Sequence, residues 1–300
     1  MPKGQPLIWH SLSVFKTIVR ALPHEKAVAL GGALGALVAK LTPKKFREAC
    51  ARCEKVLGVS QERAEEIVRG AYRHFGSAAA EFARMPLVAG NIDSLVSCSG
   101  LEYVRDAVES KRGAILATAH IGNWEYGAAW LAHQGLPVNA LGAEQRDERI
   151  TELIRELRQA GGTKALGKAE DLKAMIGALK RGEVIAVPID QDAKEFGVVS
   201  PFLGFPASTP TGPEKLAARL GCDVIPGFCI RRPDGVTFEM KFYPPMKGKN
   251  GAPFGRETQS GADDLNAVIS REIALHPEQW MWMYPRWESV ERGIFDDRGN

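Results

Sequence analysis

The first 86 residues show helical periodicity and no strand-like run of apolar residues. Apolar side chains between Leu7 and Leu22 recur at spacings of mostly three and four, which predicts an amphipathic helix that ends at Pro23. Further helices are predicted at residues 26–40, 42–57 and 60–75, with helical composition continuing to Met85. The sequence therefore predicts an N-terminal helical segment over residues 1–86.

From Gly113 onward, short apolar runs alternate with amphipathic stretches. Buried strands are predicted at 114–118, 136–142, 184–190 and 223–230, and an edge or antiparallel strand at 236–243. Helices are predicted at 123–135, 147–159, 169–180, 211–220 and 263–275. Because strands that alternate with helices form βα units, we expect an α/β fold, with a mostly parallel sheet and helices on both faces. This domain spans residues 87–300 and is expected to pack with the helical segment as one unit.

The composition is that of an ordinary folded protein, since 45% of the 300 residues are hydrophobic and 25% are charged. No segment reaches the roughly 18 to 20 uninterrupted apolar residues that a membrane-spanning helix needs. The N-terminus also lacks the basic, apolar and small-residue regions of a secretory signal peptide. We therefore expect neither a spanning helix nor a cleaved signal.

The net charge of +3 is too small to indicate a nucleic-acid partner, but it is unevenly distributed. Residues 1–60 hold 10 basic and 3 acidic side chains, a net charge of +7. The rest of the chain holds 29 basic and 33 acidic side chains, a net charge of −4. This division predicts an anionic partner at the N-terminal end of the protein.

The residues that follow each strand are the candidates for chemistry, because open α/β sheets bind ligands beyond the carboxyl ends of their strands. The first predicted strand is followed by His120, Asn123, Trp124 and Glu125. If His120 lies in the turn and Glu125 in the first helical turn, the carboxylate can support the imidazole as a general base. The chain has no G-x-S-x-G nucleophile, so such a base would act directly on a substrate hydroxyl. The alternative is that both side chains are only structural.

The third predicted strand ends at Asp190, and Asp192 follows two residues later. This D-x-D pair is either a solvated loop or a cation site of a metal-dependent glycosyltransferase that uses a nucleotide sugar. No further acidic cluster lies nearby, and the C-x-x-C pair of Cys50 and Cys53 has no second pair of ligands. We therefore expect no metal site.

The fourth helix of the α/β part begins with a capping-box pattern, Thr211-Gly-Pro-Glu214, and Thr209 lies just upstream. The free N–H groups at such a helix start can bind an anion. Simple capping of the helix is the alternative.

Five motifs occur in one order: HIGNWE, LKRGEVIAVPIDQD, PFLGFPASTPTGPEKLA, VIPGFCIRRPDG and HPEQWMWMYPRW. In this order they resemble the lysophospholipid and lipid A acyltransferase superfamily, above all the lauroyl and myristoyl acyltransferases of lipid A biosynthesis. The resemblance covers nearly the whole chain, to about Glu288. It implies an O-acyltransferase that needs no cofactor and moves a fatty acyl group from acyl carrier protein or CoA to a lipid hydroxyl.

The resemblance also assigns roles to individual residues. It makes His120 the general base and Glu125 its charge partner, and it adds Asn123 and Trp124 of the same motif to the substrate site. An arginine that assists the substrate corresponds best to Arg158, with Arg155 as the alternative. Further positions that match substrate-binding residues of the family are Asp190, Thr209 and Thr211.

The expected acceptor is a lipid A precursor, and a lysophospholipid or another glycolipid is the alternative. Family members often have a spanning N-terminal helix, but here Lys16 and Arg20 interrupt the apolar run. We therefore expect a helix that lies in the membrane interface, on the cytoplasmic face of the inner membrane, against anionic lipid. A lipid-binding protein without catalytic activity is a further alternative.

Overall fold

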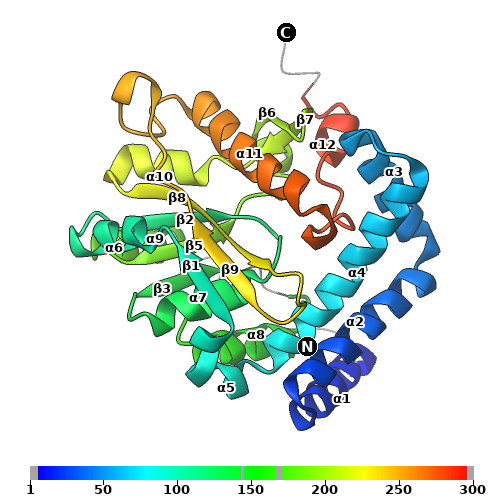
Figure 1. Cartoon of the computed structure of the whole chain (residues 1–300). Coiled ribbons are helices and arrows are strands. Elements are labelled where there is room, and N and C mark those ends of the chain that lie inside the picture. Colours follow the sequence, from blue (N-terminus) through cyan, green and yellow to red (C-terminus); the bar gives the residue numbers. More distant parts are fainter. Residues whose placement is uncertain (1–5, 143–144, 167–170, 296–300) are drawn as a thin grey trace.

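The computed structural model describes residues 6–142, 145–166 and 171–295. The N-terminal part is helical, as the periodicity predicts (Figure 1). Its elements are α1 (Pro6–Ala21), α2 (His24–Leu41), α3 (Pro43–Leu57), α4 (Gln61–Ala83), α5 (Met85–Val88) and the 3₁₀ helix η1 (Ala89–Ser94). The hydroxyl of Ser60 accepts a hydrogen bond from the Arg63 amide and so caps α4, which runs two turns beyond its predicted end.

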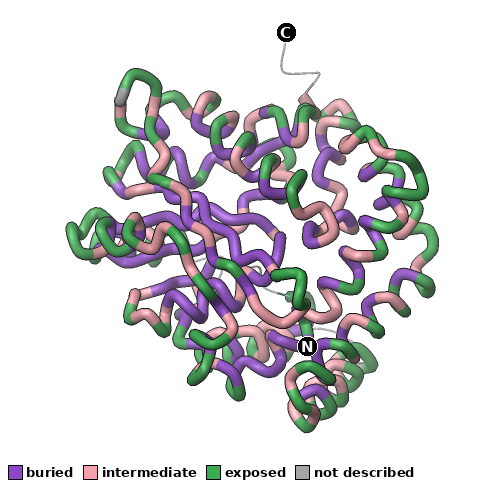
Figure 2. Tube along the Cα trace, in the orientation of Figure 1, coloured by how far each residue is buried: buried purple, intermediate pink, exposed green. Residues whose placement is uncertain are grey.

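The centre of the molecule is a seven-stranded sheet in the order β1-β9-β8-β2-β5-β3-β4. The strands are β1 (Val96–Ser99), β2 (Ala114–Thr118), β3 (Val138–Leu141), β4 (Lys164–Leu166), β5 (Val184–Pro188), β8 (Asp223–Arg231) and β9 (Phe238–Phe242). Every neighbouring pair is parallel except β8 and β9, so the predicted mostly parallel sheet is confirmed. Strands β2, β3, β5 and β8 are buried along most of their length, whereas the short strands β1 and β4 are not (Figure 2).

Helices cover both faces of the sheet, and alternate residues of β2 separate the two packing clusters. Ile115 and Ala117 pack in the cluster that holds side chains of α9, α10 and α11, whereas Ala114 and Leu116 pack with those of α6, α7 and α8. The bounds are α6 (Leu101–Glu109), α7 (Trp124–His133), α8 (Glu148–Ala160), α9 (Asp171–Lys180), α10 (Gly212–Leu220) and α11 (Thr258–Leu275). The predicted first residue of α9, Ala169, lies outside the described residues.

Several strands are not predicted by the sequence pattern. Strands β1 and β4 are only four and three residues long, too short to show a period. Residues 198–209, for which the pattern predicts no element, form a hairpin of β6 (Val198–Phe202) and β7 (Phe205–Thr209), which stands apart from the main sheet. For β9, the sequence predicts an edge or antiparallel strand. The strand is antiparallel to β8, but it is not at the edge of the sheet, because β1 pairs with its other side. The remaining elements are η2 (Lys194–Phe196), η3 (Lys249–Gly251), η4 (Pro277–Gln279) and α12 (Glu288–Glu291).

Candidate active site

The turn between β2 and α7 carries His120 to the carboxyl end of the sheet. Asn123 caps α7, since its side-chain oxygen accepts a hydrogen bond from the Tyr126 amide at 3.0 Å. Gly122 has a φ of 59°, and a Cβ atom there would collide with the carbonyl oxygen of Cys229. Only glycine fits this turn without strain. The local sequence therefore dictates the turn that holds His120.

The carboxylate that supports His120 is that of Asp190, at the end of the neighbouring strand β5. The ring Nδ1 of His120 lies 2.8 Å from Asp190 Oδ1, and the backbone amide of His120 donates to Oδ2 at 2.8 Å. The indole Nε1–H of Trp280 donates to the same Oδ2 at 2.8 Å. The predicted pairing of His120 with Glu125 is corrected here, because Asp190 occupies the position behind the imidazole.

This pairing decides the protonation of the imidazole. Since the Asp190 carboxylate accepts at Nδ1, the neutral ring carries its proton there and presents Nε2 as a base. Burial works to lower the pKa of His120, but the charge and hydrogen bond of Asp190, with the charge of Glu125, raise it above its ordinary value. Burial works to raise the pKa of Asp190, and the histidine and its other hydrogen-bond donors outweigh this and lower it. Asp190 is thus an ionised partner of His120.

Glu125 makes its main contact with Arg158 of α8. The guanidinium Nε and Nη2 of Arg158 lie 3.0 and 2.8 Å from the two carboxylate oxygens, and Trp124 Nε1 donates to Oε1 at 3.1 Å. Both members of this ion pair are largely shielded from solvent. The alternative, Arg155, instead pairs with Glu152 on the surface of α8. Of the two arginines, the structure brings Arg158 to the site.

A cavity of about 840 Å³ opens beside these groups, within the usual size of a small-molecule site. Of the predicted site residues, its lining includes His120, Asn123, Trp124, Glu125 and Arg158. Its walls are mainly apolar side chains of α1, α4, α8 and α9: Leu12, Phe15, Phe75, Phe82, Ile150, Leu153, Ile154, Leu157, Leu172 and Met175. One polar end and long apolar walls suit a ligand that has a reactive head and a hydrocarbon chain.

Thr209 and Thr211 are not in the lining of this cavity, so their predicted role in substrate binding stays a prediction. The Thr209 hydroxyl is fully buried, where it accepts from Asn266 Nδ2 and Arg286 Nη2. Thr211 precedes α10, but its side chain makes no capping hydrogen bond. The capping box is not formed either, because Glu214 is buried without a partner, and burial raises its pKa to about 7. Thr209 thus belongs to a buried polar cluster with Asn266 and Arg286, and Thr211 is buried as well.

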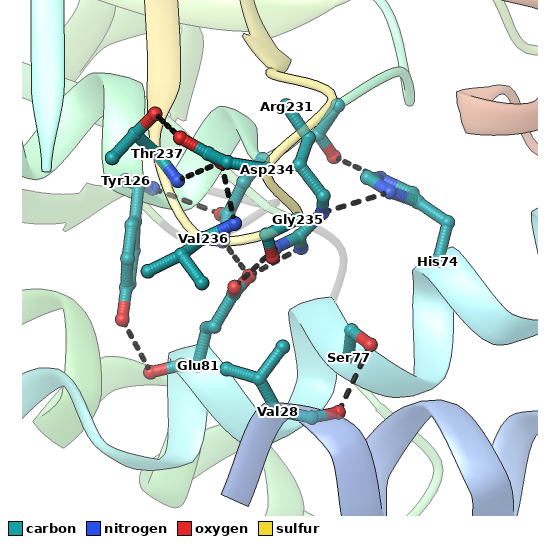
Figure 3. Close-up of polar contacts among 12 residues, drawn as sticks. Val28, His74, Ser77, Glu81, Tyr126, Arg231, Asp234, Gly235, Val236 and Thr237 are labelled. Carbon is teal, nitrogen blue, oxygen red and sulfur yellow. Dashed lines mark hydrogen bonds and ion pairs between the residues drawn. The ribbon is translucent and has the colours of Figure 1, made fainter. Parts of the chain in front are cut away.

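The His120 turn is also fixed by polar side chains that sequence reasoning missed. Arg231 at the end of β8 forms a two-pronged ion pair with Glu81 of α4, with contacts of 2.5 and 2.7 Å, and its Nε points to His74 (Figure 3). The side-chain Nδ2 of Asn123 donates to Glu81 Oε2 at 2.8 Å. Because both polar ends of Asn123 are bonded within the protein, this residue orients the turn.

His74 completes the support from α4. Its Nε2 lies 2.9 Å from the carbonyl oxygen of Gly122, and burial with the nearby Arg231 lowers its pKa to about 3. A neutral ring therefore donates to the turn at any physiological pH. One feature of the sequence indicates this support: Glu81 is a charged residue in the otherwise apolar stretch of residues 78–83.

The two aspartates do not form an open cation site. Asp190 is fully engaged with His120 and Trp280, and Asp192 accepts from the amides of Lys194 and Ser289. Among the residues that the structure describes, no group of three or more His, Cys, Asp or Glu side chains could hold a metal ion. The paired carboxylates serve the neighbouring backbone and the histidine.

Comparison with known proteins places the chain among the acyltransferases, enzymes that move an acyl group to an acceptor. More particularly, it belongs to the bacterial lipid A biosynthesis acyltransferase family, whose model matches residues 5–289. The resemblance drawn from the five motifs is confirmed. Membership in this family leaves the metal-dependent glycosyltransferase and the non-catalytic lipid-binding protein without support.

Relatives with different acceptors match the chain at similar identity. The phosphatidylinositol mannoside acyltransferase of Mycolicibacterium smegmatis is 26% identical over 277 residues, covering 90% of this chain and 88% of that protein. The lipid A biosynthesis palmitoleoyltransferase of Escherichia coli K12 is 25% identical over 291 residues, covering 94% and 91%. The lipid A biosynthesis lauroyltransferase of the same strain is 28% identical over 197 residues, covering 65% and 62%.

Proposed function

We propose that the protein transfers a fatty acyl group from an acyl thioester, on acyl carrier protein or CoA, to a hydroxyl of a lipid A precursor. The observation that carries this proposal is the His120–Asp190 pair at the polar end of a large apolar cavity. Such a pair is a base for a hydroxyl, and the cavity offers room for a hydrocarbon chain. No cofactor takes part in the proposed reaction.

In the proposed mechanism, His120 Nε2 removes the proton of the acceptor hydroxyl while Asp190 stabilises the imidazolium that forms. The acceptor oxygen attacks the thioester carbonyl and gives a tetrahedral oxyanion. Collapse of this intermediate forms the ester, breaks the carbon–sulfur bond, and returns the proton from His120 to the leaving thiolate. The products are one ester and one thiol.

Arg158 is the residue to which we assign stabilisation of the oxyanion. Glu125 engages its Nε and Nη2, and within the described part of the chain no acceptor binds Nη1. A cation at the polar end of an apolar cavity stabilises developing negative charge more strongly than one in water. Glu125 therefore acts through Arg158, as a positioning residue.

A lipid A precursor as acceptor is supported by the family and by the two Escherichia coli relatives, which are named for lipid A biosynthesis. A second acceptor class, a phosphatidylinositol mannoside, is favoured by the match to the mycobacterial relative, which covers 88% of that protein. Mass spectrometry of lipids from cells with and without the gene distinguishes the two classes. Loss of one acyl chain from lipid A supports the first; unchanged lipid A with altered phospholipids contradicts it.

We further propose that residues 1–86 dock the protein on the cytoplasmic face of the inner membrane. Helices α1 and α2 lie at one edge of the molecule (Figure 1). Both helices expose large apolar side chains. These are Leu7, Ile8, Val14 and Ile18 of α1 and Leu34, Leu37, Val38 and Leu41 of α2. No helix in the described ranges has the length and hydropathy to cross a bilayer. An apolar face with lysines beside it fits an anionic lipid surface.

Replacing Lys26, Lys40 and Lys44 by Gln should weaken binding to vesicles that contain anionic lipid by roughly 100-fold at low salt. All three side chains are exposed, so their loss removes attraction to the lipid surface without disturbing the packing. Co-sedimentation with phosphatidylglycerol-containing vesicles measures the effect. The matched control replaces the exposed Lys180, Lys215 and Lys247 of the α/β part, with the same change in charge. Equal losses in both variants would refute docking through the helical segment.

A further inference from the structure

We propose that helix α1 forms the far wall of the cavity and sets the length of the acyl chain that the protein accepts, with Phe15 and Leu12 as the specificity-determining residues. This inference rests on the proposed function, because it names the hydrocarbon chain of the acyl donor as the occupant of the cavity. Four observations on α1, α4 and α8 carry it.

Helix α8 fixes the direction of the cavity. At its C-terminal end, Arg158 is bound to Glu125 beside His120, so this end marks the reactive centre. The lining residues Leu157, Ile154, Leu153 and Ile150 follow along one face of α8 toward its N-terminus. Eight residues separate Ile150 from Arg158, which is roughly 12 Å along a helix. The apolar wall therefore leads away from the reactive groups.

Helix α1 stands where this wall ends. The guanidinium of Arg149, next to Ile150, lies 5.2 Å from the centre of the Trp9 ring of α1. About one and two turns further along α1, Leu12 and Phe15 line the cavity. The N-terminal end of α8 thus meets α1 at Trp9, at the end of this wall remote from Arg158, and Leu12 and Phe15 continue the lining along α1.

The position of α1 is held by hydrogen bonds to α4. Arg20 Nε donates to the carbonyl oxygen of Ala83 at 2.7 Å, and Arg84 Nη1 donates to those of Val19 and Leu22. Phe15 packs against the buried cluster that contains Val19 and Ala83. A wall that is anchored in this way resists displacement by a longer ligand.

The two faces of α1 have separate roles. Leu12 and Phe15 are half-buried and line the cavity, whereas Val14 is exposed on the other side of the helix. A chain that fits as far as the wall gains from the burial of each methylene group, and a longer one must overpack against the Phe15 ring. The side chains at positions 12 and 15 therefore set a limit on chain length.

The test measures the binding of saturated fatty acids of increasing length to the purified full chain, by displacement of a fluorescent fatty acid. For Phe15→Ala, the best-bound acid should become longer by at least one two-carbon step, with about a tenfold change in the ratio of adjacent dissociation constants. Leu12→Trp narrows the same end and should shift the preference to shorter acids. Val14→Ala is the matched control on the outer face and should leave the profile unchanged.

Unchanged profiles in both Phe15→Ala and Leu12→Trp, in proteins with the wild-type circular dichroism spectrum, would overturn the inference. An equal shift in Val14→Ala would overturn it as well. Acyl transfer is measured separately on the same proteins. A wild-type protein that binds acids by length but transfers no acyl group would contradict the proposed function and leave α1 as the wall of a fatty-acid site.

Discussion

Replacing His120 by glutamine lowers the rate of acyl transfer by about 10³-fold, within the range that general-base catalysis supplies. Glutamine fills a similar volume, but its amide cannot accept the proton of the acceptor hydroxyl at neutral pH. The thioester can still enter the cavity, since the apolar walls are unchanged. Steady-state kinetics should therefore show the loss in kcat and a smaller change in KM for the donor.

The control for this variant is His133→Gln. His133 lies in the last turn of α7, where it pairs with Asp93 on the surface, away from the cavity lining. Its replacement should leave the rate within about twofold, as for most surface substitutions. If His120→Gln keeps more than a tenth of the wild-type rate while folded, His120 is not the base.

The Asp190→Asn variant should lose about 10² to 10⁴ in kcat/KM and should also change the pH profile. His120 must be neutral to act as a base, so activity falls as the pH drops through its pKa. Asp190 raises this pKa, and burial opposes the rise. In Asp190→Asn, the carboxylate that counteracts the effect of burial is lost. The pKa of His120 therefore falls, and the acidic limb of the profile moves to lower pH.

Asp192→Asn is the matched control, because this carboxylate lies two residues further on and accepts from the amides of Lys194 and Ser289 without touching His120. Thermal unfolding of both variants separates an effect on stability from an effect on catalysis. The acidic limb of the Asp192→Asn profile should stay in place. An Asp190→Asn profile with the same acidic limb as the wild type would show that Asp190 does not tune the base.

Most of the fold follows from local patterns. The amphipathic periods predict α1 to α4, and the unbroken apolar runs predict β2, β3, β5 and β8. The hairpin of β6 and β7 could not be predicted in this way, since its two short strands each contain a proline, Pro201 and Pro206, which is untypical of a strand. Pairing with distant segments, as between β1 and β9, depends on contacts that no local pattern records.

The difference between local patterns and distant contacts also explains why the sequence predicts His120 but not its partner. The position of His120 after a strand predicts its role. Spacing along the chain, however, favours Glu125 as its partner, because this is the next carboxylate in the sequence. In the sheet, β2 and β5 are neighbours and Thr118 pairs with Pro188, so His120 and Asp190 each lie two residues beyond one matched pair. Strand order, a property of the whole fold, decides which carboxylate meets the imidazole.

The most direct test of the account is acyl transfer by the purified full chain, with an acyl thioester as donor and a lipid A precursor as acceptor, followed by mass spectrometry of the lipid. The account predicts a product heavier by one acyl group, with one thiol released for each ester formed, and almost none from His120→Gln. Thioester consumption without an acylated lipid, or equal product from the wild type and His120→Gln, would contradict it.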